Sequence, residues 1–179
     1  MLGGVLLVVA AGCDGGSSSD LADRVWIGEI DDDTFVAVVT DDERVLAYVC
    51  DGTPEAVSVA TWFVGTHDGA GFSLSNASGR TFSGAIEEDA ITGQLILGDE
   101  ALAYMAAPAA GDAGVFLADE GELRGGWIVH ADGSQRGAVL HRTTGDIVSA
   151  QLIKTTQTSV VLQTRASPLQ QLSQPVLPK

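Results

Sequence analysis

Short runs of β-branched and aromatic residues, each bounded by turn-forming residues, recur along most of this chain. They lie at 24–30, 34–40, 44–50, 57–64, 72–75, 81–86, 91–97, 102–106, 114–117, 126–130, 137–141, 147–154 and 159–164. Runs of this kind predict β-strands, and the chain has no long amphipathic helical pattern that is free of glycine or acid clusters. We therefore predict an all-β fold, an antiparallel meander that forms a closed or partly closed barrel, with a β-sandwich as the alternative.

An internal repeat supports the meander. A shift of 56 residues aligns 24–49 with 80–105 without a gap, and seven of the 26 aligned pairs are identical, among them Leu46-Ala47-Tyr48 with Leu102-Ala103-Tyr104. The identities favour a duplicated unit of three strands joined by acidic turns, whereas two copies are too few for a solenoid. We expect Tyr48 and Tyr104 to occupy equivalent places and to fill the barrel interior.

The composition narrows the range of partners. The hydrophobic fraction of 45% predicts a globular chain rather than a disordered one. The formal net charge is −15, and all 24 acidic residues lie within residues 1–146. Such a surface repels phosphate backbones, so we expect no nucleic-acid partner.

The N-terminal residues resemble a bacterial lipoprotein signal. An apolar run at 5–9 leads into Ala10-Ala11-Gly12 and then Cys13, although no Lys or Arg precedes the run. The run is too short for a transmembrane helix. We expect a signal peptide at 1–12, a lipidated Cys13 with a flexible Gly/Ser tether at 13–23, a β-domain at 24–164 and a Pro/Gln-rich tail at 165–179.

This interpretation predicts a location in the bacterial cell envelope, outward of the cytoplasmic membrane, with the lipid on Cys13 as the membrane contact. Plain secretion and a cytosolic location are the alternatives. Cys50 ends an apolar run, so we expect it to be a small buried hydrophobe. A disulfide between the two cysteines is open only if Cys13 carries no lipid.

The tail contains three prolines and no acid, which favours an extended and mobile segment. Its apolar residues could instead pack back on the barrel or dock on a partner. The residues concerned are Leu169, Leu172, Val176 and Leu177.

Four acid clusters, at 31–33, 41–43, 87–89 and 99–100, raise the question of calcium. We expect solvated turns, because successive turns of a meander lie at opposite ends and none of the clusters matches an EF-hand loop. We therefore predict no metal site and no cofactor. A weak site remains open if the repeat brings the first and third clusters to one end, through Asp31, Asp33, Glu87 and Asp89.

Catalytic motifs are also missing from the sequence. There is no nucleophile elbow and no glycine-rich phosphate loop. His130 and His141 flank a hairpin signal at Asp132-Gly133 and could face one another, but no third metal ligand follows from the sequence. We predict that the protein is not an enzyme.

Several phrases resemble a group of uncharacterised bacterial secreted proteins and lipoproteins over about residues 24–140. They are Ala47-Tyr48-Val49-Cys50-Asp51-Gly52, Trp62 with Gly65, Ala113-Gly114-Val115-Phe116, Gly126-Trp127-Ile128-Val129 and Asp132-Gly133-Ser134-Gln135-Arg136-Gly137. The group has no assigned activity, so the resemblance implies export but no site residue.

The leading hypothesis is a membrane-anchored, non-catalytic β-domain that binds a ligand or an envelope protein. The alternative is a calycin-like barrel that carries one small apolar ligand, since small barrels can be filled or hollow. The candidate ligand-lining residues are Tyr48, Tyr104, Trp62 and Trp127. An envelope hydrolase is the third hypothesis.

Overall fold

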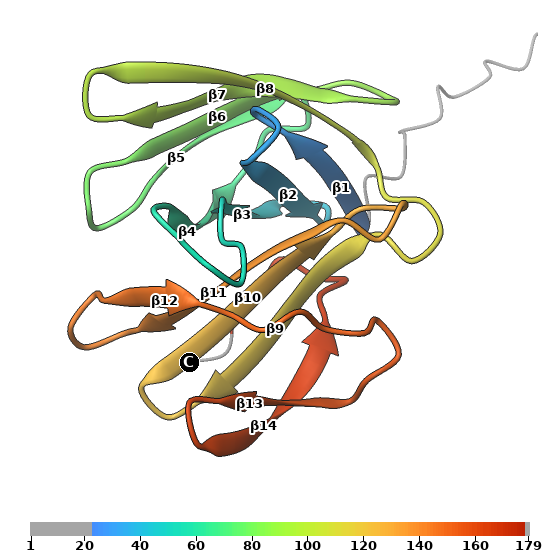
Figure 1. Cartoon of the computed structure of the whole chain (residues 1–179). Helices are drawn as coiled ribbons and strands as arrows, with labels where there is room; N and C mark the ends of the chain where they lie inside the picture. Colours follow the sequence, from blue (N-terminus) through green and yellow to red (C-terminus); the bar gives the residue numbers. More distant parts are fainter. Residues whose placement is uncertain (1–22, 178–179) are drawn as a thin grey trace, which may run out of the picture.

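The computed structural model describes residues 23–177, and this range contains strands and their connections but no helix (Figure 1). It therefore holds no helix long and apolar enough to cross a membrane. Fourteen strands are all paired antiparallel, which confirms the all-β prediction. They are β1 (Arg24–Glu29), β2 (Phe35–Thr40), β3 (Arg44–Cys50), β4 (Ala60–Thr66), β5 (Gly71–Ser75), β6 (Thr81–Ile86), β7 (Ile91–Leu97), β8 (Glu100–Pro108), β9 (Gly114–Glu120), β10 (Leu123–Val129), β11 (Gln135–His141), β12 (Ile147–Ser149), β13 (Ser159–Leu162) and β14 (Arg165–Gln171).

The first eight strands form one sheet in the order β4-β3-β2-β1-β8-β7-β6-β5. Its two end strands, β4 and β5, follow each other in the chain and lie in contact, so the sheet is a nearly closed barrel. The other six strands form a half-barrel in the order β12-β11-β10-β9-β14-β13. The predicted meander is thus divided between two sheets.

Side chains fill the barrel interior. Trp26, Phe63 and Phe82 are fully buried there among smaller aliphatic residues. The rings of Phe63 and Phe82 lie 5.4 Å apart, and those of Phe82 and Tyr104 lie 4.6 Å apart. Offset stacking at these distances is typical of a packed core, so the barrel interior is occupied by the protein itself.

The half-barrel packs against the outside of the barrel. Ile27, Leu46 and Tyr48 on the outer face of β1–β3 contact Val115 and Ile128 on the half-barrel. Strands β2 and β3 are therefore buried on both faces. A third apolar cluster, which includes Trp127 and Val139, lies on the other face of the half-barrel.

Tyr48 and Tyr104, which the repeat alignment makes equivalent, face opposite sides of the barrel wall. Tyr104 lies in the interior cluster, whereas Tyr48 lies in the cluster between barrel and half-barrel. The expectation that both fill the interior is therefore wrong for Tyr48, although both side chains are buried. The duplication itself stays a prediction.

A register difference of one residue explains the two orientations. Trp26 pairs with Val38, but its aligned counterpart Phe82 pairs with Leu95, which aligns with Val39. Since side chains alternate along a strand, a shift of one residue exchanges the two faces of every strand that follows.

The C-terminal segment is also different from the expectation. Arg165–Gln171 form β14, which pairs with β9 on one side and β13 on the other. Leu169 and Leu172 are buried. The expectation of a mobile tail is therefore wrong over this strand. The alternative that the apolar residues pack back onto the fold holds for these two leucines and for Leu177, which packs partly buried against the cluster between the sheets, but not for the exposed Val176.

Candidate functional site

The structure separates the first and third acid clusters. Strand β1 is antiparallel to β8, β8 to β7, and β7 to β6, so β1 and β6 run in opposite directions. The turns that follow them lie at opposite ends of the barrel, and Glu88 accepts a hydrogen bond from Arg24 at the start of β1 (3.1 Å). The weak site that would join Asp31 and Asp33 to Glu87 and Asp89 is therefore excluded.

No group of three His, Cys, Asp or Glu side chains within residues 23–177 could hold a metal ion. His130 and His141 also lie apart: His130 follows the end of β10, while His141 pairs with Leu123 at the start of that strand. The two histidines that could have faced one another are at opposite ends of the hairpin.

The four candidate ligand-lining residues are in three different places. Tyr104 belongs to the filled barrel interior, where its hydroxyl donates to the carbonyl of Ser83 (3.1 Å). Tyr48 and Trp62 stack between barrel and half-barrel with ring centroids 4.0 Å apart. Trp127 lies on the far face of the half-barrel.

Close backbone packing holds the junction between the two sheets. The Tyr48 hydroxyl donates to the carbonyl of Gly126 (3.3 Å). A Cβ at Gly126 would lie 2.7 Å from ring atoms of both Tyr48 and Trp62, so the two rings require a glycine there. Gly137 donates its N–H to the carbonyl of Gly52 (2.8 Å), and a Cβ at Gly52 would lie 2.1 Å from the Gly137 carbonyl oxygen.

Arg136 fixes the other end of this junction. Its guanidinium donates to the carbonyls of Asp32 (2.8 Å) and Asp33 (2.7 Å) in the β1–β2 turn and lies over the ring of Phe35. The acidic turn thus contributes backbone oxygens to the fold. Tyr48, Gly52, Gly126 and Gly137 meet at this junction, so they have a structural role here.

Cys50 also lies at the junction. It is fully buried and free, which confirms the expected small buried hydrophobe. Burial raises the pKa of its thiol to about 11. A thiol with such a pKa is almost entirely protonated at neutral pH and is a poor nucleophile.

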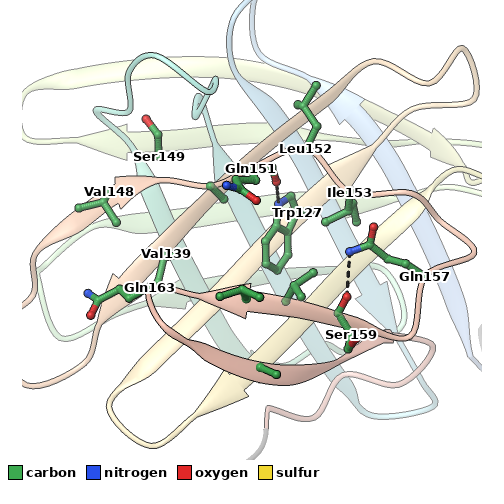
Figure 2. A pocket seen from close by; sticks show the side chains of 14 residues that line it. Trp127, Val139, Val148, Ser149, Gln151, Leu152, Ile153, Gln157, Ser159 and Gln163 are labelled. Carbon is green, nitrogen blue, oxygen red and sulfur yellow. Dashed lines mark hydrogen bonds between the residues drawn. The ribbon is translucent and has the colours of Figure 1, made fainter.

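The far face of the half-barrel carries a pocket of about 430 Å³ around Trp127 (Figure 2). Strand β12 and the connection 150–153 form one wall, and β13 forms the other. The volume is in the range of ligand pockets for small molecules. None of its lining residues is charged, in a chain with 24 acids and nine bases.

Three of the exposed large hydrophobic residues line this pocket: Val148, Leu152 and Val161 are 48%, 61% and 62% exposed. The amides of Gln151, Gln157 and Gln163 lie among them (Figure 2). Apolar walls with a few amide groups suit an uncharged ligand that has one or two hydrogen-bonding groups.

Two side chains hold the connection 150–153 over the half-barrel. Gln135 accepts from the N–H of Ile153 (2.8 Å) and donates to its carbonyl (3.2 Å). The indole N–H of Trp127 donates to the carbonyl of Gln151 (2.9 Å). The pocket wall is therefore fixed by hydrogen bonds before any ligand is bound.

Sequence reasoning found only Trp127 of this pocket. The other lining residues come from short strands and an irregular connection without a motif, and the Gln135 contact spans 18 residues of chain. No local sequence pattern predicts such a contact. The chain matches no protein-family model, and no curated sequence matches it.

Proposed function

We propose that this protein is a lipid-anchored binding domain of the bacterial cell envelope, without catalytic activity, which holds a small uncharged ligand in the half-barrel pocket. The uncharged pocket of about 430 Å³ around Trp127 carries the proposal. The N-terminal lipoprotein-like signal supports the location.

The pocket is a better ligand site than the barrel. A calycin-like carrier needs a hollow interior, and here large aromatic side chains occupy it. The half-barrel closes only part of its circumference, so its concave face keeps space between β12 and β13. The site proposed for the small uncharged ligand therefore lies on the second sheet.

Because no charged residue lines the pocket around Trp127, we expect its ligand to be uncharged. A carboxylate, phosphate or ammonium group would lose its hydration in this pocket without gaining a counter-charge. An apolar body, by contrast, gains about 25 cal/mol for each Å² of apolar surface removed from water. The amides of Gln151 and Gln163 add hydrogen bonds that select the orientation of the ligand, whereas the Gln157 amide already binds the Lys154 N–H (2.8 Å) and the Ser159 carbonyl (3.0 Å).

Native mass spectrometry of protein purified from its own host tests this function. We expect a co-purified mass that is released by denaturation and is reduced in Ala150→Phe, which fills the pocket at a buried lining position. Ser159→Trp fills it from an exposed position, so it serves where Ala150→Phe lowers the Tm. Ala56→Phe adds the same ring on an exposed barrel loop and is the matched control.

Retention of the same mass by both pocket-filling variants would place the ligand elsewhere and overturn the assignment to this pocket. If no bound small-molecule mass is ever found and an envelope protein co-purifies instead, the small-molecule proposal is wrong and the binding partner is a protein.

A further inference from the structure

A second pocket, of about 400 Å³, lies where the barrel meets the edge of the half-barrel. Strand β4 and the β5–β6 turn form its barrel side, and β10, β11 and the start of β12 form the other side. Clefts between packed layers are common ligand sites. This pocket differs in chemistry from the uncharged pocket around Trp127.

Three arginines line the junction pocket: Arg80, Arg124 and Arg142. They are a third of the nine Lys and Arg residues in a chain of net charge −15, and no acidic residue lines the pocket with them. The charged residues of the lining are therefore all cationic, although the protein as a whole is acidic.

Arg124 and Arg142 share one carboxylate. Arg124 lies 2.7 Å from Asp119 Oδ2, and Arg142 lies 2.7 Å from Asp119 Oδ1. The side chains of Arg124, Arg142 and Asp119 are only 11%, 29% and 15% exposed. Asp119 therefore holds both largely buried guanidinium groups in place beside the pocket.

Arg80 adds a third cation from the β5–β6 turn. Asn76 fixes this turn to β4, because its amide donates to the hydroxyl of Thr61 (2.8 Å) and its carbonyl accepts from Ser78 Oγ (2.7 Å) and from the N–H of Arg80 (3.2 Å). Within residues 23–177 the Arg80 guanidinium has no hydrogen-bond or ion-pair partner. It is therefore available to a ligand.

Trp62 supplies an aromatic wall. One face of its indole stacks on Tyr48, which holds the ring in place, and the half-buried remainder lines the pocket. Leu140 and Ile147 line it on the half-barrel side. Flat apolar groups pack well against such a wall, while arginine pairs with carboxylates and phosphates in a planar, two-pronged arrangement.

We propose that the junction pocket binds a planar organic anion, whose carboxylate or phosphate pairs with Arg80 and whose ring packs against Trp62. The site is independent of the uncharged pocket and of its ligand. It gives this acidic protein a second, charge-selective binding function.

Isothermal titration calorimetry with 2-naphthoate tests the proposal, with uncharged 2-naphthamide and non-planar cyclohexanecarboxylate as matched probes. We expect 2-naphthoate to bind at least tenfold more tightly than either, since each lacks one of the two recognised features. Phenyl phosphate, titrated in parallel, distinguishes a phosphate preference from a carboxylate preference. Raising the salt concentration should weaken the binding of both anions.

Arg80→Gln should weaken 2-naphthoate binding about tenfold without loss of stability, because the guanidinium makes no contact that the fold uses. Trp62→Leu should weaken 2-naphthoate more than cyclohexanecarboxylate. Arg165→Gln is the control: Arg165 is an exposed arginine on β14 beside Glu120 and should leave the affinity unchanged.

Equal affinity for 2-naphthoate and 2-naphthamide would overturn the proposal. An anion affinity that is the same in wild type and Arg80→Gln would also overturn it, because the anion would then bind another part of the surface. Neither result bears on the ligand of the uncharged pocket.

Discussion

At the scale of single residues, the junction between the sheets depends on glycines that let rings and backbones approach. Gly126 faces Tyr48 and Trp62, and Gly52 faces Gly137, each with too little space for a Cβ. The missing side chain is the condition for the ring stack that lines the junction pocket. These glycines therefore allow the two sheets to pack as closely as they do.

We predict that Gly126→Ala lowers the free energy of unfolding by about 1–3 kcal/mol, because the new methyl group overpacks the two rings. Chemical denaturation with an unchanged m-value measures the loss. In a Trp62→Leu background one of the two clashes is gone, so the cost of Gly126→Ala should be smaller. Strict additivity of the two substitutions would contradict the packing explanation.

Residue orientation was the least predictable property. The gapless repeat alignment makes Tyr48 and Tyr104 equivalent, but the turn between β1 and β2 spans residues 30–34 and that between β6 and β7 spans 87–90. One residue fewer in the turn reverses which face of the following strands is inside. Sequence identity between the copies carries no information about where each turn closes.

At the scale of elements, β14 shows why composition misled the sequence-based expectation. Proline lacks an N–H and is normally found at strand edges. Pro168 pairs with Ser159 of β13 but lies one residue before Leu169–Gln171, the part of β14 that pairs with β9. The N–H that proline lacks is therefore not needed, and the strand forms around it.

We predict that Leu169→Ala lowers the free energy of unfolding by about 2–5 kcal/mol, because Leu169 is only 8% exposed in the far cluster of the half-barrel. Leu152→Ala is the matched control: this leucine is 61% exposed and its truncation should change stability by less than about 0.5 kcal/mol. A loss of stability from Leu169→Ala as small as the one expected from Leu152→Ala would show that Leu169 contributes little to the folded core.

At the scale of the whole molecule, the division into two layers has a signal in the sequence that strand prediction alone does not use. The segments Phe35–Thr40 and Arg44–Cys50 are apolar at nearly every position rather than at alternate ones. Strands covered on both faces have this pattern, whereas β5 alternates because one face is exposed. The all-β class was predictable, but the partner sheet depends on contacts between distant strands.

The layered arrangement also determines where the uncharged pocket lies relative to the proposed lipid anchor. The chain enters the barrel at Arg24, and the uncharged pocket is on the face of the half-barrel that is turned away from the barrel. Cys13 lies outside the described residues. A lipid on Cys13 would therefore hold the barrel by its first strand and leave the pocket face of the half-barrel free.

We predict that Cys13→Ser moves the protein from the membrane fraction to the soluble fraction of its host, because the lipid is its only proposed membrane contact. Immunoblots of separated fractions measure the shift, and the mass of the wild-type N-terminal peptide should show acylated Cys13. Cys50→Ala removes the other thiol and should leave fractionation unchanged. If Cys13→Ser stays in the membrane fraction after a high-salt wash, the anchor is not Cys13, and the domain reaches the membrane through its folded surface.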